Sequence, residues 1–160
     1  MDEPRYTIQP AAKGRRLLES TPWGIETVYR KDGSTSYPTF PSTPVHPMCI
    51  IDSGYSLGHP DLPTDAQGAD PDQDQPGDNY YFGTDTCAHG THVAGTIAAI
   101  GNNDEGVVGV WPGAPGLQII KVFDNSNCDR DCNCWVYSST LVAAMQRCAA
   151  SGAKIISSEI

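Results

Sequence analysis

Apolar runs and a segment of small residues form the main pattern along the chain after residue 47. The runs Met48–Ile51, Val107–Val110 and Leu117–Phe123 are short and rich in branched residues, which is typical of buried strands. Between them, His89–Ile100 is dense in small residues and includes two glycines. Because each glycine inside a helix costs about 1 kcal/mol relative to alanine, a helix that keeps them needs close backbone packing. This segment therefore predicts a buried helix.

A second helix and a last strand complete the pattern. Ser138 or Ser139 can cap a helix, and Gly152 is a suitable residue just after its end. The apolar positions of this helix include Leu141, Val142, Met145 and Cys148. The segment Lys154–Ile160 predicts another strand. The order strand, helix, strand, helix, strand indicates an α/β layered domain with a largely parallel sheet. Since a natural domain rarely ends inside a core strand, we expect the sequence to be truncated.

Composition and charge exclude some classes of partner. The chain has 160 residues, with 10 Lys+Arg against 19 Asp+Glu and a formal net charge of -9. This balance argues against nucleic acid or an anionic membrane as the main partner, since both require clustered basic residues. No apolar run approaches the roughly 18 residues of a membrane span. The N-terminal string MDEPRYTIQP is acidic and polar, so no signal peptide is visible.

The six cysteines are many for a cytosolic chain of this size, and their spacing leaves all fifteen pairings open. Cys49 lies in an apolar run, which favours a small buried thiol. The string CDRDCNC, from Cys128 to Cys134, could bind a metal ion, but its spacing is not a standard zinc spacing. We therefore expect disulfides or free thiols there. Oxidised cysteines would favour a secretory compartment.

Two residues carry the candidate chemistry. Asp52 follows the first predicted strand, and functional groups of open α/β sheets gather at the carboxyl ends of strands. His89 begins the small-residue helix. An aspartate that accepts a hydrogen bond from one imidazole nitrogen frees the other nitrogen to take a proton from a nucleophile. Taken singly, such residues are more often a turn cap and a structural histidine. Zinc binding by His89 and His92 is disfavoured, because no glutamate follows His89.

Taken together, IIDSGY (Ile50 to Tyr55) and HGTHVAGTIAA (His89 to Ala99) closely resemble the motifs of the subtilisin-like serine proteases, the subtilases. The similarity runs from about Thr21 to Ile156. TPWGI resembles the start of the mature enzyme, HPDL follows the aspartate motif, and the later strings GNNDEGVVGV, LQIIKVF and SSTLVAAMQRCAASGAKII continue in register. The resemblance implies a parallel-sheet, three-layer α/β fold of subtilisin type. Residues 1–20 would be a propeptide tail or linker, and residues 21–160 part of the catalytic domain.

The resemblance also implies a function and a set of site residues. It implies a secreted serine endopeptidase that cleaves peptide or protein substrates with an Asp-His-Ser triad and is bound by its own propeptide. Asp52 would be the orienting acid and His89, not His92, the general base. Asp61 corresponds to a ligand of a structural calcium ion, with Asn103 and Glu19 as further candidates. Calcium prefers such oxygen ligands.

The resemblance fails near the C-terminal end. The nucleophilic serine of a Gly-Thr-Ser-Met-Ala string and the oxyanion-hole asparagine are expected beyond Ile160, and no serine of this chain has that setting. The family's last strand here, which binds substrate backbone, usually reads Met-Ser-Leu-Gly-Gly; this chain has Ser157, Ser158 and Glu159, with Ser158 the substrate-binding candidate. We expect the chain alone to be inactive. The alternatives are a non-catalytic truncated paralogue that binds peptides or a partner, and a metal or redox module built on the cysteines.

Overall fold

A computed structural model describes residues 19–29, 46–69, 81–123, 128–129 and 131–158. Its strands are β1 (Met48–Asp52), β2 (Gln67–Ala69), β3 (Gln118–Lys121) and β4 (Ile155–Ser158). Its helices are α1 (Trp23–Tyr29), α2 (His89–Ala98) and α3 (Ser138–Ala150). Within these ranges, the helices are too short or too polar to cross a membrane.

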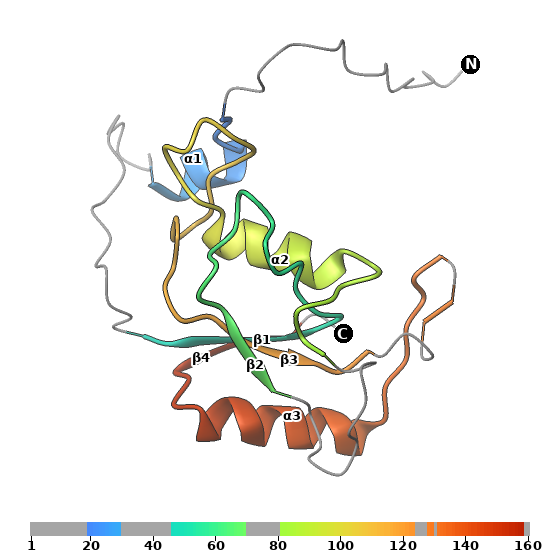
Figure 1. Cartoon of the computed structure of the whole chain (residues 1–160). Coiled ribbons are helices and arrows are strands. Elements are labelled where there is room, and N and C mark those ends of the chain that lie inside the picture. The colour runs from blue at the N-terminus through green and yellow to red at the C-terminus, as the bar shows by residue number, and fades with distance from the viewer. Residues whose placement is uncertain (1–18, 30–45, 70–80, 124–127, 130, 159–160) are drawn as a thin grey trace, which may run out of the picture.

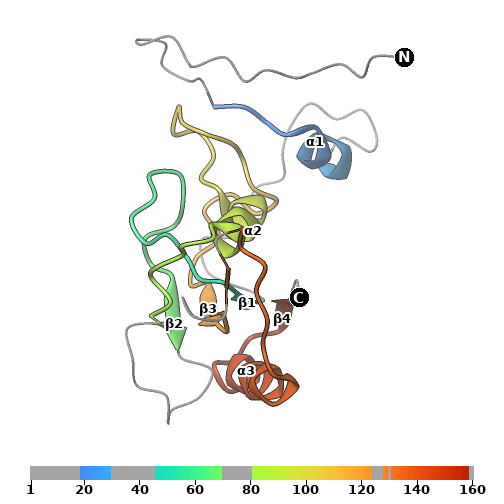
Figure 2. The same ribbon diagram turned by 90° about the vertical axis from the view of Figure 1, so that its right-hand side faces the viewer.

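The four strands form one parallel sheet in the order β2-β3-β1-β4. Figure 1 shows α2 on one face of this sheet and α3 on the other, and the turned view of Figure 2 shows the same layers. The fold is therefore the predicted three-layer α/β arrangement. The short helix α1 lies beyond α2, on the side away from the sheet.

The alternation of side chains along β1 divides the core in two. Ile50 joins the cluster that includes Val93, Ala94 and Ala98 of α2. Cys49 and Ile51 join the other cluster, which includes Ala144 and Cys148 of α3. Because successive side chains of a strand point to opposite faces, Asp52 has the same direction as Ile50. The aspartate at the end of β1 therefore faces the α2 layer.

The prediction that His89–Ile100 is a buried helix is only half right. Gly90, Val93, Ala94 and Ala98 of α2 are buried against the sheet. Gly95 has open space where a side chain would lie, and it lines an open apolar groove of about 740 Å³ between α1 and α2. Close packing therefore explains Gly90 but not Gly95.

The predicted strand at Val107–Val110 is wrong. Val107 forms only an isolated bridge with Ser20. The next backbone N–H groups donate to carbonyl oxygens at the end of α2: Gly109 to Ala99, Val110 to Thr96 and Trp111 to Ile97. The last carbonyls of a helix have no partner within the helix, so this apolar segment satisfies them instead of pairing in the sheet.

Two elements were absent from the sequence predictions. The first is α1: Pro22 lies just before this helix, and its carbonyl accepts hydrogen bonds from the N–H groups of Ile25 and Glu26. Proline near the start of a helix loses no intrahelical bond, because its missing N–H would have had no partner. The strand β2 has three residues, too few for a recognisable alternation.

The structure contains three disulfides: Cys49–Cys148, Cys87–Cys132 and Cys128–Cys134. The prediction of a free buried thiol at Cys49 is wrong, since this residue connects β1 to α3. The local preference for a thiol reflected only the apolar neighbours of Cys49, whereas its partner is distant in sequence. Disulfides or free thiols were expected in the CDRDCNC string, and the structure has disulfides there: Cys128 is bonded to Cys134 and Cys132 to Cys87.

We predict that replacing both Cys49 and Cys148 by alanine will lower the free energy of unfolding by about 2 to 5 kcal/mol. This disulfide closes a long loop, with a sequence separation of 99, and so strongly restricts the unfolded chain. Urea unfolding under non-reducing conditions measures the loss. The matched control is the Cys128→Ser/Cys134→Ser variant, whose disulfide spans a separation of only 6. Equal losses in the two variants would contradict the prediction.

Candidate active site

Asp52 and His89 meet at the junction of β1 and α2. The Nδ1 atom of His89 lies 2.9 Å from Oδ1 and 3.1 Å from Oδ2 of Asp52. The side chain of Asp52 is 1% exposed, whereas that of His89 is 54% exposed. The predicted proximity of these two residues is therefore confirmed. A buried carboxylate holds the Nδ1 edge of an imidazole that reaches solvent.

The exposed imidazole borders an open pocket of about 480 Å³. The pocket is lined by Asp52, Ser53, Cys87, Ala88, His89, His92, Phe123, Cys132 and Cys134. These residues come from the end of β1, the start of α2 and the segment after β3. The carboxyl ends of parallel strands thus border the pocket, as is usual in open α/β folds.

Ser53 and Asp85 support the Asp52–His89 pair, and the sequence analysis missed both roles. The backbone N–H of Ser53 donates to Oδ1 of Asp52 at 2.6 Å. The Ser53 hydroxyl oxygen lies 3.1 Å from that atom and 2.8 Å from Oδ1 of Asp85, so its proton has two possible acceptors. The same hydroxyl oxygen accepts a hydrogen bond from the N–H of Gly90. Ser53 therefore connects both carboxylates to the start of α2.

Asp85 also caps α2 from outside the helix. Its Oδ2 accepts hydrogen bonds from the N–H of Thr91 at 2.8 Å and from the Thr91 hydroxyl at 2.6 Å. The residue at the N-cap position, Ala88, has a left-handed backbone (φ 59°) and forms no side-chain cap. A carboxylate near a helix N-terminus is favourable because the free N–H groups there carry partial positive charge. An aspartate shortly before a predicted helix was the available sequence signal.

A glycine allows the helix to come this close to the strand. A Cβ atom on Gly90 would overlap the carbonyl oxygen of Gly54 and lie 3.1 Å from Cβ of Asp52. Any larger residue would push the start of α2 away from β1. The hydrogen bond between Asp52 and His89 therefore depends on the absence of a side chain at residue 90.

Tyr55 anchors the chain that follows Asp52. This residue is fully buried, and its hydroxyl donates to the carbonyl oxygen of Pro63 at 2.6 Å. Its backbone N–H donates to the carbonyl oxygen of Phe82. Burial raises the pKa of the Tyr55 phenol, and the negative charge of Asp65 adds to this effect. The phenol therefore stays protonated and keeps donating its hydrogen bond.

Comparison with known proteins gives matches over the part of the chain that contains Asp52 and His89. The model of the Subtilase family (peptidase S8) matches residues 47–158, which include β1, α2 and β4. The chain belongs to the subtilase family. Subtilisin-like protease 1 of Plasmodium berghei is 36% identical over 127 residues, covering 68% of this chain and 21% of that protein. Subtilisin E of Bacillus subtilis is 46% identical over 81 residues, covering 49% of this chain and 19% of that protein.

Two solved subtilase structures are also similar. The psychrophilic subtilisin-like protease Apa1 of Pseudoalteromonas sp. AS-11 is 40% identical, with a TM-score of 0.60 over 89% of this chain and 30% of that chain. The nisin leader peptidase NisP of Lactococcus lactis is 29% identical, with a TM-score of 0.62 over 84% of this chain and 36% of that chain. The chain thus spans only about a fifth of the length of the curated relatives and about a third of these structures.

The residues that the subtilase resemblance assigned to calcium lie together. Oδ1 of Asp61 accepts a hydrogen bond from Nδ2 of Asn103, and Oδ2 accepts one from the N–H of Val107. The carboxylate of Glu19 accepts a hydrogen bond from the N–H of Asn103. Asp61 is buried, with 5% exposure. A segment near the N-terminus, the loop after β1 and the loop after α2 therefore meet at Asn103, whose amide nitrogen faces Asp61 and whose amide oxygen accepts a hydrogen bond from the N–H of Glu105.

Ser158, the substrate-binding candidate, ends the edge strand β4. It pairs in register with Ile51, one residue before Asp52, and it is exposed. Within the described residues, β4 pairs with β1 and has no strand on its other side. Ser158 thus lies at the end of the edge strand next to β1, the strand that carries Asp52.

We predict that Asp85→Ala will lower the free energy of unfolding by about 1 to 3 kcal/mol, because it leaves donors of Ser53 and Thr91 without their acceptor. It should also change the ¹⁵N shifts of the His89 ring. Asp85→Asn keeps one acceptor oxygen and should fall between Ala and the native residue. Asp131→Ala, an exposed substitution with the same charge change, is the control. Unchanged stability and unchanged His89 signals in Asp85→Ala would show that Asp85 does not position the pair.

Proposed function

We propose that this chain carries the aspartate and histidine of a secreted serine endopeptidase that cleaves peptide or protein substrates. The observation that carries the proposal is the contact between His89 Nδ1 and the buried carboxylate of Asp52 at 2.9 Å. This is the orientation in which an imidazole can take a proton through its other ring nitrogen. Subtilase membership supports the same reaction class.

In this proposal His89 acts first as a base and then as an acid. It takes the proton of a serine hydroxyl as the oxygen attacks the peptide carbonyl, and then gives that proton to the leaving amine. Water releases the acyl group from the serine in a second round of the same chemistry. Asp52 keeps the Nδ1 proton of His89 in place and stabilises the imidazolium that forms. The serine and the oxyanion-hole asparagine would come from residues outside the 160 of this chain.

The edge strand supports a place for the substrate. An extended peptide can add to a free sheet edge through backbone hydrogen bonds. Within the described residues, β4 offers such an edge next to β1, whose last residue, Asp52, lines the pocket. Ser158 would contact the substrate backbone at the end of β4. Residues 1–20 would be the tail of a propeptide that occupies the enzyme before release, and all but the last two of them lie outside the described residues. The three disulfides fit a secreted protein.

We expect the purified 160-residue chain to show no turnover of peptide substrates. In subtilisin itself, a member of this family, loss of the serine costs about 10⁶-fold in kcat. A fluorogenic peptide panel measures the residual rate, with heat-denatured chain as the background. Turnover that disappears in the His89→Ala variant would contradict the expected inactivity and would show that this chain is a complete catalyst.

The same test extends to a longer form of the protein that includes a Gly-Thr-Ser-Met-Ala string. There, His89→Ala should reduce kcat by about 10⁶-fold, and Asp52→Asn by about 10⁴-fold. His92→Ala, which changes an exposed histidine of the same pocket, is the matched control and should keep most of the activity. Activity that survives His89→Ala would exclude the proposed triad. Peptide binding without turnover in the longer form would favour the alternative, a non-catalytic binding module.

We also propose that Asp61, Asn103 and Glu19 hold a structural calcium ion, as the subtilase resemblance implies. The residue types fit this ion, because calcium prefers carboxylate and amide oxygens. The Asn103 amide oxygen, which accepts a hydrogen bond from the N–H of Glu105, would turn toward Asp61 to bind the ion. The backbone of Gly106 has a positive φ of 55°, and a Cβ atom there would overlap the Asp61 carboxylate, so the glycine keeps the space beside the carboxylate open. Calcium would neutralise this buried acid and, in the form that retains Glu19, tie the three segments together.

Millimolar calcium should raise the melting temperature by about 5 to 10 °C when it exceeds its Kd about a hundredfold, because it binds only the folded state. Differential scanning fluorimetry with and without a chelator measures the shift. Asp61→Asn should abolish it. Glu105→Gln, which removes the same charge from an exposed residue of the same loop, should keep it. A shift of equal size in Asp61→Asn would place calcium elsewhere.

A further inference from the structure

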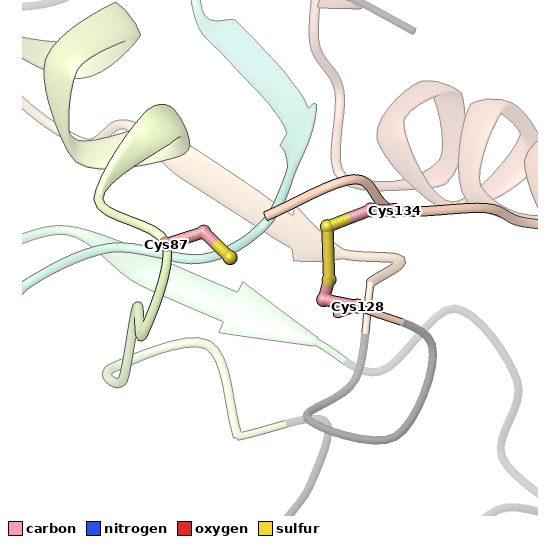
Figure 3. Close-up of side chains that lie close together, drawn as sticks. All are labelled: Cys87, Cys128 and Cys134. Atoms are coloured by element: carbon pink, nitrogen blue, oxygen red, sulfur yellow. A yellow bond between two sulfur atoms is a disulfide. The ribbon is translucent and has the colours of Figure 1, made fainter. Parts of the chain in front are cut away.

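Four cysteines gather at the rim of the candidate active site. Cys87 lies two residues before α2, and Cys128, Cys132 and Cys134 lie in the segment between β3 and α3. The Sγ atoms of Cys87, Cys128 and Cys134 lie within 4.8 Å of one another, and Cys132 is bonded to Cys87. Figure 3 shows the Cys87 sulfur pointing toward the Cys128–Cys134 bond. The cluster thus has four sulfur atoms from two distant parts of the chain.

These two disulfides differ from the third in their access to solvent. Cys132 is exposed, and Cys87, Cys128 and Cys134 are partly exposed. Cys49 and Cys148, by contrast, are both 0% exposed. Reduction requires direct attack on a disulfide sulfur, so accessible disulfides react first. A mild reductant should therefore open the two rim disulfides and leave the core disulfide closed.

Hydrogen bonds hold the rim loop independently of its disulfide. The carboxylate of Asp129 accepts hydrogen bonds from the side chain of Asn133 at 2.8 Å and from the N–H groups of Asp131 and Asn133. The Asp129 N–H also donates to the Asn133 carbonyl oxygen. After reduction, Cys128 and Cys134 should therefore remain neighbours.

The other side of the cluster is held by α2. Cys87 follows Asp85 by two residues, and Asp85 is bonded to Ser53 and to the first turn of the helix. On the side of the rim loop, Val136, two residues after Cys134, packs against the core cluster that includes Ile51 and Ile120. Both sides of the cluster therefore keep contacts with the sheet layer that do not involve sulfur. Loss of the two disulfides would leave four thiols close together instead of releasing them into solvent.

We propose that the reduced form binds one thiophilic divalent cation, such as Zn²⁺, through Cys87, Cys128, Cys132 and Cys134. Zinc–sulfur bonds of about 2.3 Å in a tetrahedron place the sulfurs roughly 3.8 Å apart. The Sγ atoms of Cys87, Cys128 and Cys134, all within 4.8 Å of one another, need only small movements to reach this geometry, whereas Cys132 joins them from its bond to Cys87. The fourth ligand comes from before α2, which explains why the spacing within the CDRDCNC string did not identify a site.

The chemistry separates into reduction and binding. Each disulfide takes two electrons from a phosphine reductant and two protons from a water molecule. The phosphine is oxidised to its oxide with the oxygen of that water, and each disulfide yields two thiols. The cation then displaces thiol protons to solvent as the sulfurs bind as thiolates. The oxidised form holds no thiolate and should not bind the ion. This site differs from the proposed calcium site, whose ligands are hard oxygens, and it does not depend on the proposed peptidase function.

The test uses the full 160-residue chain, reduced under native conditions with a limited amount of phosphine and kept free of oxygen. Thiol titration should count four thiols. Addition of Cd²⁺, a spectroscopic substitute for Zn²⁺, should produce a sulfur-to-metal absorption band that saturates at one equivalent and disappears when Zn²⁺ is added. Six thiols, no band, or saturation above one equivalent would overturn the proposal.

Variants locate the site. Cys87→Ser/Cys132→Ser leaves two of the four ligands and should weaken Cd²⁺ binding more than about 100-fold. Cys134→Ser, which leaves three, should weaken it less, and circular dichroism checks that both variants fold. The matched control, Cys49→Ala/Cys148→Ala, removes a disulfide outside the cluster and should bind as the native chain does. Equal affinity in the native chain and in Cys87→Ser/Cys132→Ser would also overturn the proposal.

Discussion

The buried carboxylate of Asp52 is the constraint on which the site depends. A charged group with 1% exposure is costly unless polar neighbours replace the water that it has lost. Here the neighbours are the imidazole of His89 and the backbone and hydroxyl of Ser53. They reach Asp52 only because the start of α2 lies against the end of β1. The hydrogen-bonding requirement of the Asp52 carboxylate thus fixes the position of the start of α2 and the orientation of the His89 ring.

The surrounding structure serves this close approach. Gly90 removes the side chain that would keep α2 away, and Ser53 and Asp85 supply the acceptors that its first N–H groups lack. Lys121, next to Asp52 in the sheet, is fully buried and donates to the carbonyl oxygen of Thr84, which leads into the same helix. Contacts from several segments therefore hold the start of α2 against the end of β1.

The edge of the pocket contains disulfides that link two parts of the chain and are accessible to solvent. The Cys87–Cys132 disulfide connects the residues just before His89 to the segment after β3, so the pocket has a covalent link across its rim. The same sulfurs are accessible, whereas the disulfide between β1 and α3 is enclosed in the core. Reduction of the rim disulfides would therefore alter the edge of the pocket, while the enclosed disulfide would keep β1 and α3 connected.

Much of the fold could be read from local pattern. The strands at Met48 and Gln118, the helices at His89 and Ser138, and the two motifs around Asp52 and His89 all follow from neighbouring residues, because hydrophobic period and turn chemistry act over short distances. The roles of Ser53 and Asp85, the pairing of the cysteines and the backbone contacts of Gly109 could not be predicted this way. Each depends on which segments, distant along the chain, become neighbours in the folded protein. Local sequence patterns do not report distances between such segments.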